Sequence, residues 1–210
     1  MSLIRPQALI FDCDGTLADT MPLHWRAWQE VSRRYGLDFP EERFYDLGGV
    51  PARDILKMLA AEQNRSMDPL AAAKEKEAAY IAFLPEVRII EPIVKIVREN
   101  AGKLPMAVAS GGIQEHINKV LEHLGLRQFF QAVVTSEDVK RQKPAPDIYL
   151  EAARRLGVPP RFCRAYEDTD LGLRAIRAAG MEAVDVRDLA KPGASQSQFK
   201  NRGEPSRNAA

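Results

Sequence analysis

Apolar and polar positions along this chain fall into short blocks whose spacing changes from one region to the next. Five short apolar runs are typical of strands buried on both faces: residues 7–12, 104–110, 132–135, 162–168 and 182–186. Between the later runs, apolar residues recur every three or four positions, which predicts helices over residues 113–125, 146–157 and 171–180. Short apolar strands that alternate with helices predict an α/β fold, a Rossmann-like parallel sheet flanked by helices.

Residues 20–85 break this alternation. Helical patterns run over residues 22–36, 51–64 and 68–84, and no strand pattern lies among them. We therefore predict an inserted helical cap over residues 20–85 and a discontinuous α/β core over residues 1–19 and 86–191. Residues 192–210 are polar, and we expect them to pack weakly. We interpret the charged run Lys74–Glu77 as a solvated helix face and His116 as an exposed helix position.

Charge and composition narrow the possible partners. The chain of 210 residues has 30 basic and 29 acidic side chains, a net charge of +1, and no long run of one sign. Neither nucleic acid nor a membrane is therefore indicated as a partner, and no apolar stretch approaches the ~18 residues of a membrane span. Polar residues interrupt the N-terminal segment, so we expect no secretory signal. Cys13 and Cys163 then read as reduced, buried packing residues of a cytoplasmic protein, for which a monomer is the simplest expectation.

Two aspartates one residue apart follow the first predicted strand. Side chains alternate along a strand, so Asp12 and Asp14 point the same way, and two such carboxylates repel each other unless a cation or a proton compensates. Ligands bind at the carboxyl ends of the strands in an open parallel sheet. The other strands end in, or are followed by, further polar residues at that same edge: Ser110, Gly111, Lys143, Glu167 and Asp168.

This set of side chains suits phosphoryl transfer assisted by Mg²⁺. A phosphate monoester is a dianion that repels an aspartate nucleophile, so a cation must lie between them. Mg²⁺ prefers oxygen ligands, which Asp12, Asp168 and Glu167 can supply. Lys143 can neutralise the transferring group. Ser110 and the backbone N–H groups after it, including that of Gly111, can hold phosphate oxygens.

Four motifs, taken in order, resemble those of the haloacid dehalogenase superfamily. They are "DCDGTLADT", Ser110, "KPAPDIY" and "EDTDLGLRAIRAAG", and the resemblance runs from about residue 7 to residue 189. It implies that Asp12 forms an aspartyl-phosphate. It also implies that Asp14 protonates the leaving oxygen, later activates water, and binds Mg²⁺ through its backbone carbonyl. The remaining roles implied are Asp168 as a metal ligand, Glu167 as a metal ligand or a carboxylate beside it, and Ser110 and Lys143 as phosphate contacts.

The expected insertion is similar to the cap of the β-phosphoglucomutase-like branch, through "DTMPLHWRAW" and "LGGVPARDIL". The resemblance makes His24 and Gly49 candidate substrate contacts. The mutase has basic residues at the positions of Gly48 and Ala52, although Arg53 can substitute for them. The forms "GGVPA" and "KPAPD" are closer to phosphatases of the fructose-1-phosphatase type. The resemblance thus implies an Mg²⁺-dependent phosphatase of small phosphosugars, with β-phosphoglucomutase as the alternative.

Two non-catalytic alternatives remain open at this level. A receiver domain also gathers acids, a hydroxyl and a lysine on a parallel sheet, but it takes phosphate after a later strand and has no helical insertion after the first. A sugar-phosphate sensor derived from an enzyme requires a broken acid or metal site, and the sequence shows none. Both are therefore less favoured than an enzyme.

Overall fold

A computed structural model describes residues 5–189, and its centre is a five-stranded sheet. All strand pairs are parallel, in the order β3-β2-β1-β4-β5. The predicted α/β fold is confirmed, and each predicted strand is present within a residue or two of its expected bounds. The strands are β1 (Ala8–Phe11), β2 (Met106–Ala109), β3 (Ala132–Val134), β4 (Cys163–Glu167) and β5 (Glu182–Asp185).

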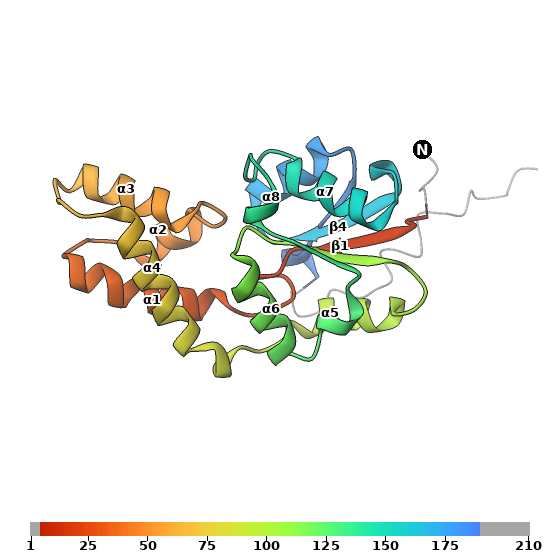
Figure 1. The fold of residues 1–210 in the computed structure, drawn as a ribbon, viewed down its shortest axis with the longest axis horizontal. Coiled ribbons are helices and arrows are strands. Elements are labelled where there is room, and N and C mark those ends of the chain that lie inside the picture. The colour runs from red at the N-terminus through yellow and green to blue at the C-terminus, as the bar shows by residue number, and fades with distance from the viewer. Residues whose placement is uncertain (1–4, 190–210) are drawn as a thin grey trace, which may run out of the picture.

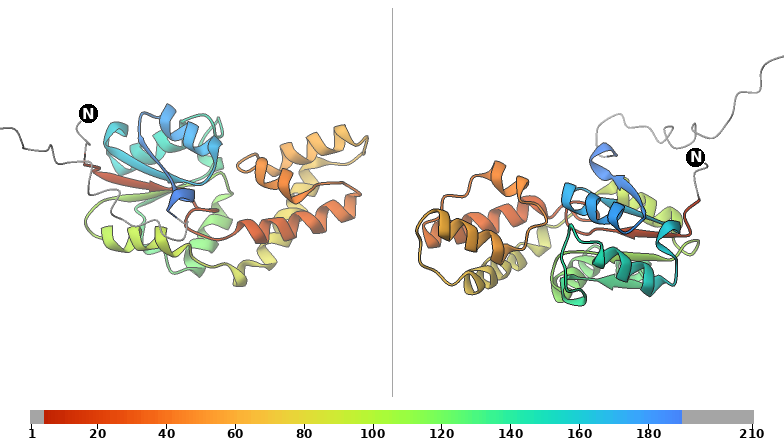
Figure 2. Two further views of the ribbon diagram at one scale, coloured as in Figure 1. Left: turned by 180° about the vertical axis from the view of Figure 1, so that it is seen from behind. Right: turned by 90° about the horizontal axis from the view of Figure 1, so that it is seen from above.

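Helices cover both faces of the sheet, as Figures 1 and 2 show. Along β1, Leu9 and Phe11 pack into the cluster that includes the apolar faces of α5 and α6, whereas Ala8 and Ile10 pack with α7 and α8. This alternation explains why β1 reads as a continuous apolar run. These helices are α5 (Glu91–Asn100), α6 (Gln114–His123), α7 (Asp147–Leu156) and α8 (Asp170–Ala178), with single turns η2 (Arg127–Phe129), η3 (Ser136–Asp138), η4 (Pro160–Phe162) and η5 (Val186–Asp188) between or after them.

Four helices between β1 and α5 stand apart from the sheet at the end where β1 finishes (Figure 1). We call them the cap helices: α1 (Met21–Tyr35), α2 (Glu41–Asp46), α3 (Ala52–Glu62) and α4 (Pro69–Ala82), followed by the turn η1 (Leu84–Glu86). They have a hydrophobic core of their own, which contains Trp28, Leu56 and Leu59. The domain boundaries themselves stay a prediction.

The chain enters and leaves the cap helices through two linker segments that lie side by side. The Asp19 N–H donates to the Arg88 carbonyl at 2.8 Å, and the Ile90 N–H donates to the Leu17 carbonyl at 3.0 Å. Both linkers are therefore anchored to each other where they meet the sheet. Such a pair of short connections is a natural hinge between two packed bodies.

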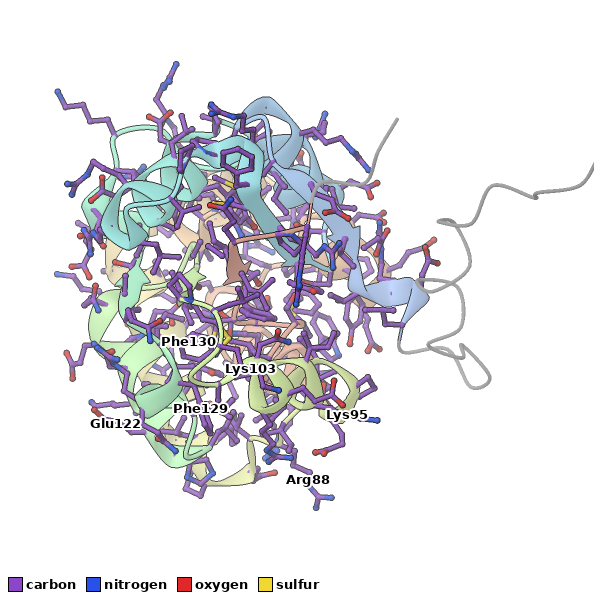
Figure 3. All side chains as sticks on the ribbon, turned by 90° about the vertical axis from the view of Figure 1, so that its right-hand side faces the viewer. Arg88, Lys95, Lys103, Glu122, Phe129 and Phe130 are labelled. Carbon is purple, nitrogen blue, oxygen red and sulfur yellow. The ribbon has the colours of Figure 1, made fainter. Side chains whose placement is uncertain are left out.

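The opposite side of the molecule carries charges of both signs. Figure 3 shows this side, with Arg88, Lys95, Lys103 and Glu122 labelled. Among the described residues, no helix is long and apolar enough to cross a membrane. The predicted polar segment, residues 192–210, lies outside the described part of the chain.

Candidate active site

The loop that follows β1 places Asp12 at the edge of the sheet and leaves room for Asp168 to approach it. The Asp12 N–H donates to the Tyr166 carbonyl at 3.0 Å, which extends the β1–β4 ladder by one residue. Gly15 follows with φ +78°, and a Cβ atom on it would overlap Oδ2 of Asp168. Glycine is therefore required here both for the backbone conformation and for the approach of Asp168.

Three carboxylates and one ammonium meet at this edge. Ligand oxygens of Asp12, Glu167 and Asp168 lie within 4.8 Å of one another. Nζ of Lys143 lies 2.7 Å from Oδ1 of Asp12 and 2.7 Å from Oε1 of Glu167, with 5% of the lysine side chain exposed. The structure thus brings together four residues that the sequence placed after three different strands. The excess of negative charge in a buried cluster calls for a further cation.

The pKa values of these groups follow from their burial. Burial is the largest influence on Asp12 and raises its pKa well above the usual range; the Lys143 charge opposes this shift, and neighbouring carboxylates reinforce it. Burial and the charge of Glu167 raise the pKa of Asp168 to about 7. Burial lowers the pKa of Lys143, but Asp12 and Glu167 outweigh it, so the net pKa is raised and the ammonium stays charged.

Glu167 is held by its neighbours on both oxygens. Oε1 accepts from Lys143, while Oε2 accepts from the backbone N–H of Thr169 and from its hydroxyl at 2.9 Å. A Cβ atom on Gly172 would overlap Oε1, so this glycine is needed for the packing of Glu167. Both oxygens of Glu167 therefore already accept hydrogen bonds. This arrangement favours a role in positioning Lys143 over direct binding of a metal ion.

Asp14 lies in a different environment, facing the first cap helix. Oδ1 accepts from the Thr20 hydroxyl at 2.7 Å and lies 3.5 Å from Nε2 of His24. Burial raises the Asp14 pKa, but the hydrogen bonds from His24 and Thr20 and the nearby Lys76 charge outweigh it, so the net pKa is lowered. Asp14 is therefore an anion here, whereas the sequence led us to expect a carboxyl group that can carry a proton.

A buried lysine from the cap helices reaches the same place. Nζ of Lys76 lies 2.7 Å from Nδ1 of His24, and Lys76 is 4% exposed. Burial, followed by the Lys76 charge, lowers the pKa of His24. The imidazole is therefore neutral, accepts from Lys76 at Nδ1 and has its proton on Nε2, facing Asp14. Our interpretation of Lys74–Glu77 as a solvated face is wrong at Lys76.

The remaining predicted residues lie around this cluster. Ser110 follows β2, is 1% exposed, and accepts at Oγ from the Gly112 N–H at 3.1 Å. Gly111 is exposed, and nothing lies within 4 Å of the place where its Cβ would be. The helix α6 begins only at Gln114, so Ser110 and Gly111 belong to a loop before it rather than to its first turn.

The loop between α2 and α3 comes from the cap helices and lies against the first turn of α8. Gly49, with φ +85°, places the position of its missing Cβ 3.6 Å from Leu171. Arg53 is 62% exposed, and its Nε bonds Oδ1 of the neighbouring Asp54 at 3.2 Å. Among the described residues, Arg53 has no contact with the carboxylate cluster, so the structure does not bring it together with the other candidates.

The donor set fits a divalent cation. All candidate ligand atoms are oxygens, two of the carboxylates have pKa values raised by burial and crowding, and a bound cation would relieve both effects. Asp12 and Asp168 have oxygens available for such an ion, because Glu167 is engaged elsewhere. The cluster is buried enough that one charge there acts on its neighbours with little screening.

Comparison with known proteins agrees with this geometry. Residues 9–186 match the haloacid dehalogenase-like hydrolase family. The chain belongs to this family. The hydrolase is 43% identical over 185 residues to fructose-1-phosphate phosphatase YqaB of Escherichia coli, an alignment that covers 88% of this chain and 98% of that protein. It is 31% identical to a phosphorylated carbohydrates phosphatase of Thermotoga maritima, over 85% of this chain and 83% of that one.

The fold of the hydrolase is also similar to solved structures. The β-phosphoglucomutase of Clostridium difficile superposes with a TM-score of 0.78 at 27% identity, over 86% of this chain and 84% of that chain. The predicted superfamily and the β-phosphoglucomutase-like branch are therefore confirmed, and so is the predicted enzyme class, a phosphoric monoester hydrolase.

Proposed function

We propose that this hydrolase removes phosphate from small phosphosugars resembling fructose 1-phosphate, with Mg²⁺ as cofactor and Asp12 as nucleophile. The observation that carries the proposal is the cluster in which Lys143 bridges Asp12 and Glu167 beside Asp168. Asp12 directly follows β1, at the edge where ligands bind in open parallel sheets. Asp12, Asp168 and the backbone carbonyl of Asp14 would hold the metal, which supplies positive charge to offset the repulsion between the carboxylate and the phosphate dianion.

The proposed reaction has two displacements at phosphorus. An oxygen of Asp12 forms a bond to phosphorus while the bond to the sugar oxygen breaks, and Asp14 gives its proton to the leaving oxygen. Water then attacks the phosphorus of the aspartyl-phosphate, Asp14 takes a proton from that water, and the bond to Asp12 breaks to release orthophosphate. Asp14 thus ends the cycle with the proton that it needs for the next one.

The resting anion of Asp14 is compatible with both of its roles. In this structure His24 and Thr20 stabilise the charged form, which is the form that accepts a proton from water. An incoming phosphate dianion raises the proton affinity of a nearby carboxylate, which favours the acid form before the first displacement. Ser110, Gly111 and Lys143 are the proposed phosphate contacts, and His24 and Gly49 are the proposed substrate contacts from the cap helices.

The substrate class rests on similarity to YqaB and on the chemistry of the loop between α2 and α3. Gly48 and Gly49 present only backbone there, and Arg53 is bonded to Asp54. A substrate with one phosphate and several hydroxyl groups needs no second cationic site. A bisphosphate needs one, and among the described residues of this loop none is free to supply it.

A phosphate-release screen tests the proposal. Sugar monophosphates, including fructose 1-phosphate, are incubated with the wild type and with Asp12→Asn, with Mg²⁺ and with EDTA. We expect release that depends on the metal and is lost in the variant, while the variant keeps its fold. Undiminished activity of Asp12→Asn would remove Asp12 as the nucleophile.

β-Phosphoglucomutase is the second candidate, because the hydrolase superposes on such an enzyme. Incubation with β-glucose 1-phosphate and a bisphosphate primer separates the two activities. Accumulation of glucose 6-phosphate would support the mutase, and accumulation of inorganic phosphate would support the phosphatase.

A further inference from the structure

A line of buried and part-buried polar side chains leaves the site and returns to the core through the cap helices. It begins with Asp14 in the core, passes through His24 on α1 and Lys76 on α4, and continues to Glu77, whose Oε1 accepts from Lys76 at 3.0 Å. Oε2 of Glu77 lies 3.4 Å from Nδ1 of His116, which is on α6 in the core. The line therefore crosses from core to cap helices at one end and back again at the other.

The contact at the far end is not yet a hydrogen bond. Nδ1 of His116 is buried and has no hydrogen-bond partner, and 18% of the side chain is exposed, so our expectation of an exposed histidine is wrong. Its distance to Glu77 exceeds a usual N–H···O distance by about 0.5 Å. A small further movement of α4 toward α6 would complete the bond, and an unpaired buried polar atom favours that movement.

We propose that Glu77 and His116 form a latch between the cap helices and the core, and that this latch positions Lys76 and His24 against Asp14 in the closed enzyme. His116 and Glu77 are positioning residues, because they act on Asp14 through Lys76 and His24. The proposal rests on the proposed function for the role of Asp14. The latch itself is a contact between the cap helices and the core, and it does not depend on which reaction the site performs.

Few other charges face His116. On α6, Glu115 and Lys119 bond each other at 2.6 Å, and on α4 the nearby charges are Glu77 and Lys76. Other elements that pack on α6 include β3, η1 and η2, and at the start of the helix the Gln114 N–H donates to Oε2 of Glu137 in η3 at 2.7 Å. Strand β3 has no titratable residue, Glu86 of η1 pairs with Arg26, and Arg127 of η2 bonds the Phe130 carbonyl. Glu77 is the acidic partner in contact with His116, and burial, which raises its pKa, is outweighed by His116 and Lys76, which lower it to about 2.

Three variants test the latch by kinetics. His116→Gln puts a side chain that cannot carry a charge opposite Glu77, His116→Lys puts a cation there, and His123→Gln is the matched control, because His123 is an exposed histidine on the same helix. We expect His116→Gln to lower kcat/KM about three- to tenfold, and His123→Gln to leave it unchanged. His116→Lys, which restores a cationic donor opposite Glu77, should recover most of the wild-type value.

A distance measurement tests the latch without relying on activity. Lys57→Cys on α3 and Lys103→Cys on the core face shown in Figure 3 accept a pair of fluorescent labels, since Cys13 and Cys163 are buried. With Mg²⁺ and inorganic phosphate, energy transfer should report fewer closed molecules for His116→Gln than for wild type or His123→Gln. Equal closure in all three, or a loss of kcat/KM in His116→Gln that His116→Lys does not recover, would overturn the latch. If no phosphosugar is hydrolysed, the proposed function fails while this measurement still decides the latch.

Discussion

Replacing Asp168 by asparagine should stabilise the metal-free protein although it destroys a metal ligand. The folded-state pKa of Asp168 is about 7, against a reference value of 3.8. The folded state therefore binds more protons than the unfolded state over this interval, and the stability of the metal-free protein falls as pH rises from about 4 through about 7. Each factor of ten in protonation is about 1.4 kcal/mol, so ionisation of this one group costs up to about 4 kcal/mol above neutral pH.

The asparagine side chain of this variant has the size of the original and keeps an oxygen that can accept from the Thr16 hydroxyl, which bonds Oδ1 of Asp168 at 3.0 Å. We expect Asp168→Asn to raise the unfolding free energy by about 2 to 4 kcal/mol at about pH 8 in EDTA, and by much less at about pH 5. Thermal and urea unfolding at both pH values measure this. In a chain of this size each kcal/mol raises Tm by about 2 to 4 °C.

With Mg²⁺ present, the wild type should instead be more stable than Asp168→Asn. A ligand present at about 100 times its Kd adds about 2.7 kcal/mol to the wild type, and Asp168→Asn should gain far less. The control is Asp170→Asn, whose carboxylate is 80% exposed two residues further along, and whose effect should stay within about 0.5 kcal/mol. A metal-free Asp168→Asn protein less stable than the wild type at about pH 8 would refute the electrostatic account of this cluster.

Other substitutions test neighbouring parts of the site. Lys143→Ala removes the cation that pairs with both Asp12 and Glu167, so phosphate release should fall at least about 100-fold and stability by about 3 kcal/mol, as steady-state assays and urea unfolding can measure. Gly172→Ala places a methyl group on top of Oε1 of Glu167, so the midpoint of urea unfolding should drop by an amount equivalent to at least about 2 kcal/mol; an unchanged midpoint would contradict the packing described. Lys76→Met removes the donor to His24, and kcat should fall about tenfold while Tm changes little; equal kcat would show that the buried lysine has no part in turnover.

Much of the fold follows from patterns that are local in the sequence. Parallel strands buried on both faces read as unbroken apolar runs, and β1, β2 and β3 have that pattern. The strands β4 and β5 each include two charged residues. Because parallel strands end at one edge, residues that follow β1, β3 and β4 had to approach one another. Asp12, Lys143, Glu167 and Asp168 do so in the structure. Their roles in catalysis and metal binding stay predictions.

The residues that the sequence did not reveal depend on contacts between distant elements. Lys76 reads as part of a charged run, yet it is buried because α4 turns it toward His24 on α1. One signal was present: Ala72 and Tyr80, four residues on either side, are apolar and buried, so Lys76 lies in the middle of the buried stripe of α4. The environment of His116 depends on how α4 meets α6, which no local pattern specifies.

The roles of Gly15 and Gly172 could not be predicted from the sequence either. Both look like ordinary turn or helix glycines in the sequence, and their role is visible only when Asp168 and Glu167 are found against them. The lowered pKa of Asp14 likewise requires knowing that Thr20 and His24 both reach Oδ1. The sequence spacing predicted an acid two residues after Asp12, but the protonation state of Asp14 depends on neighbours from other parts of the fold.

Mass spectrometry of turnover quenched in acid tests the central claim most directly. With Mg²⁺ and the best phosphosugar from the screen, the peptide that contains Asp12 should gain the mass of one phosphoryl group, with fragmentation placing it on Asp12. The modified peptide should be absent without metal and absent in Asp12→Asn. Rapid release of phosphate with no modified peptide at any quench time, or with the group on another residue, would contradict the account.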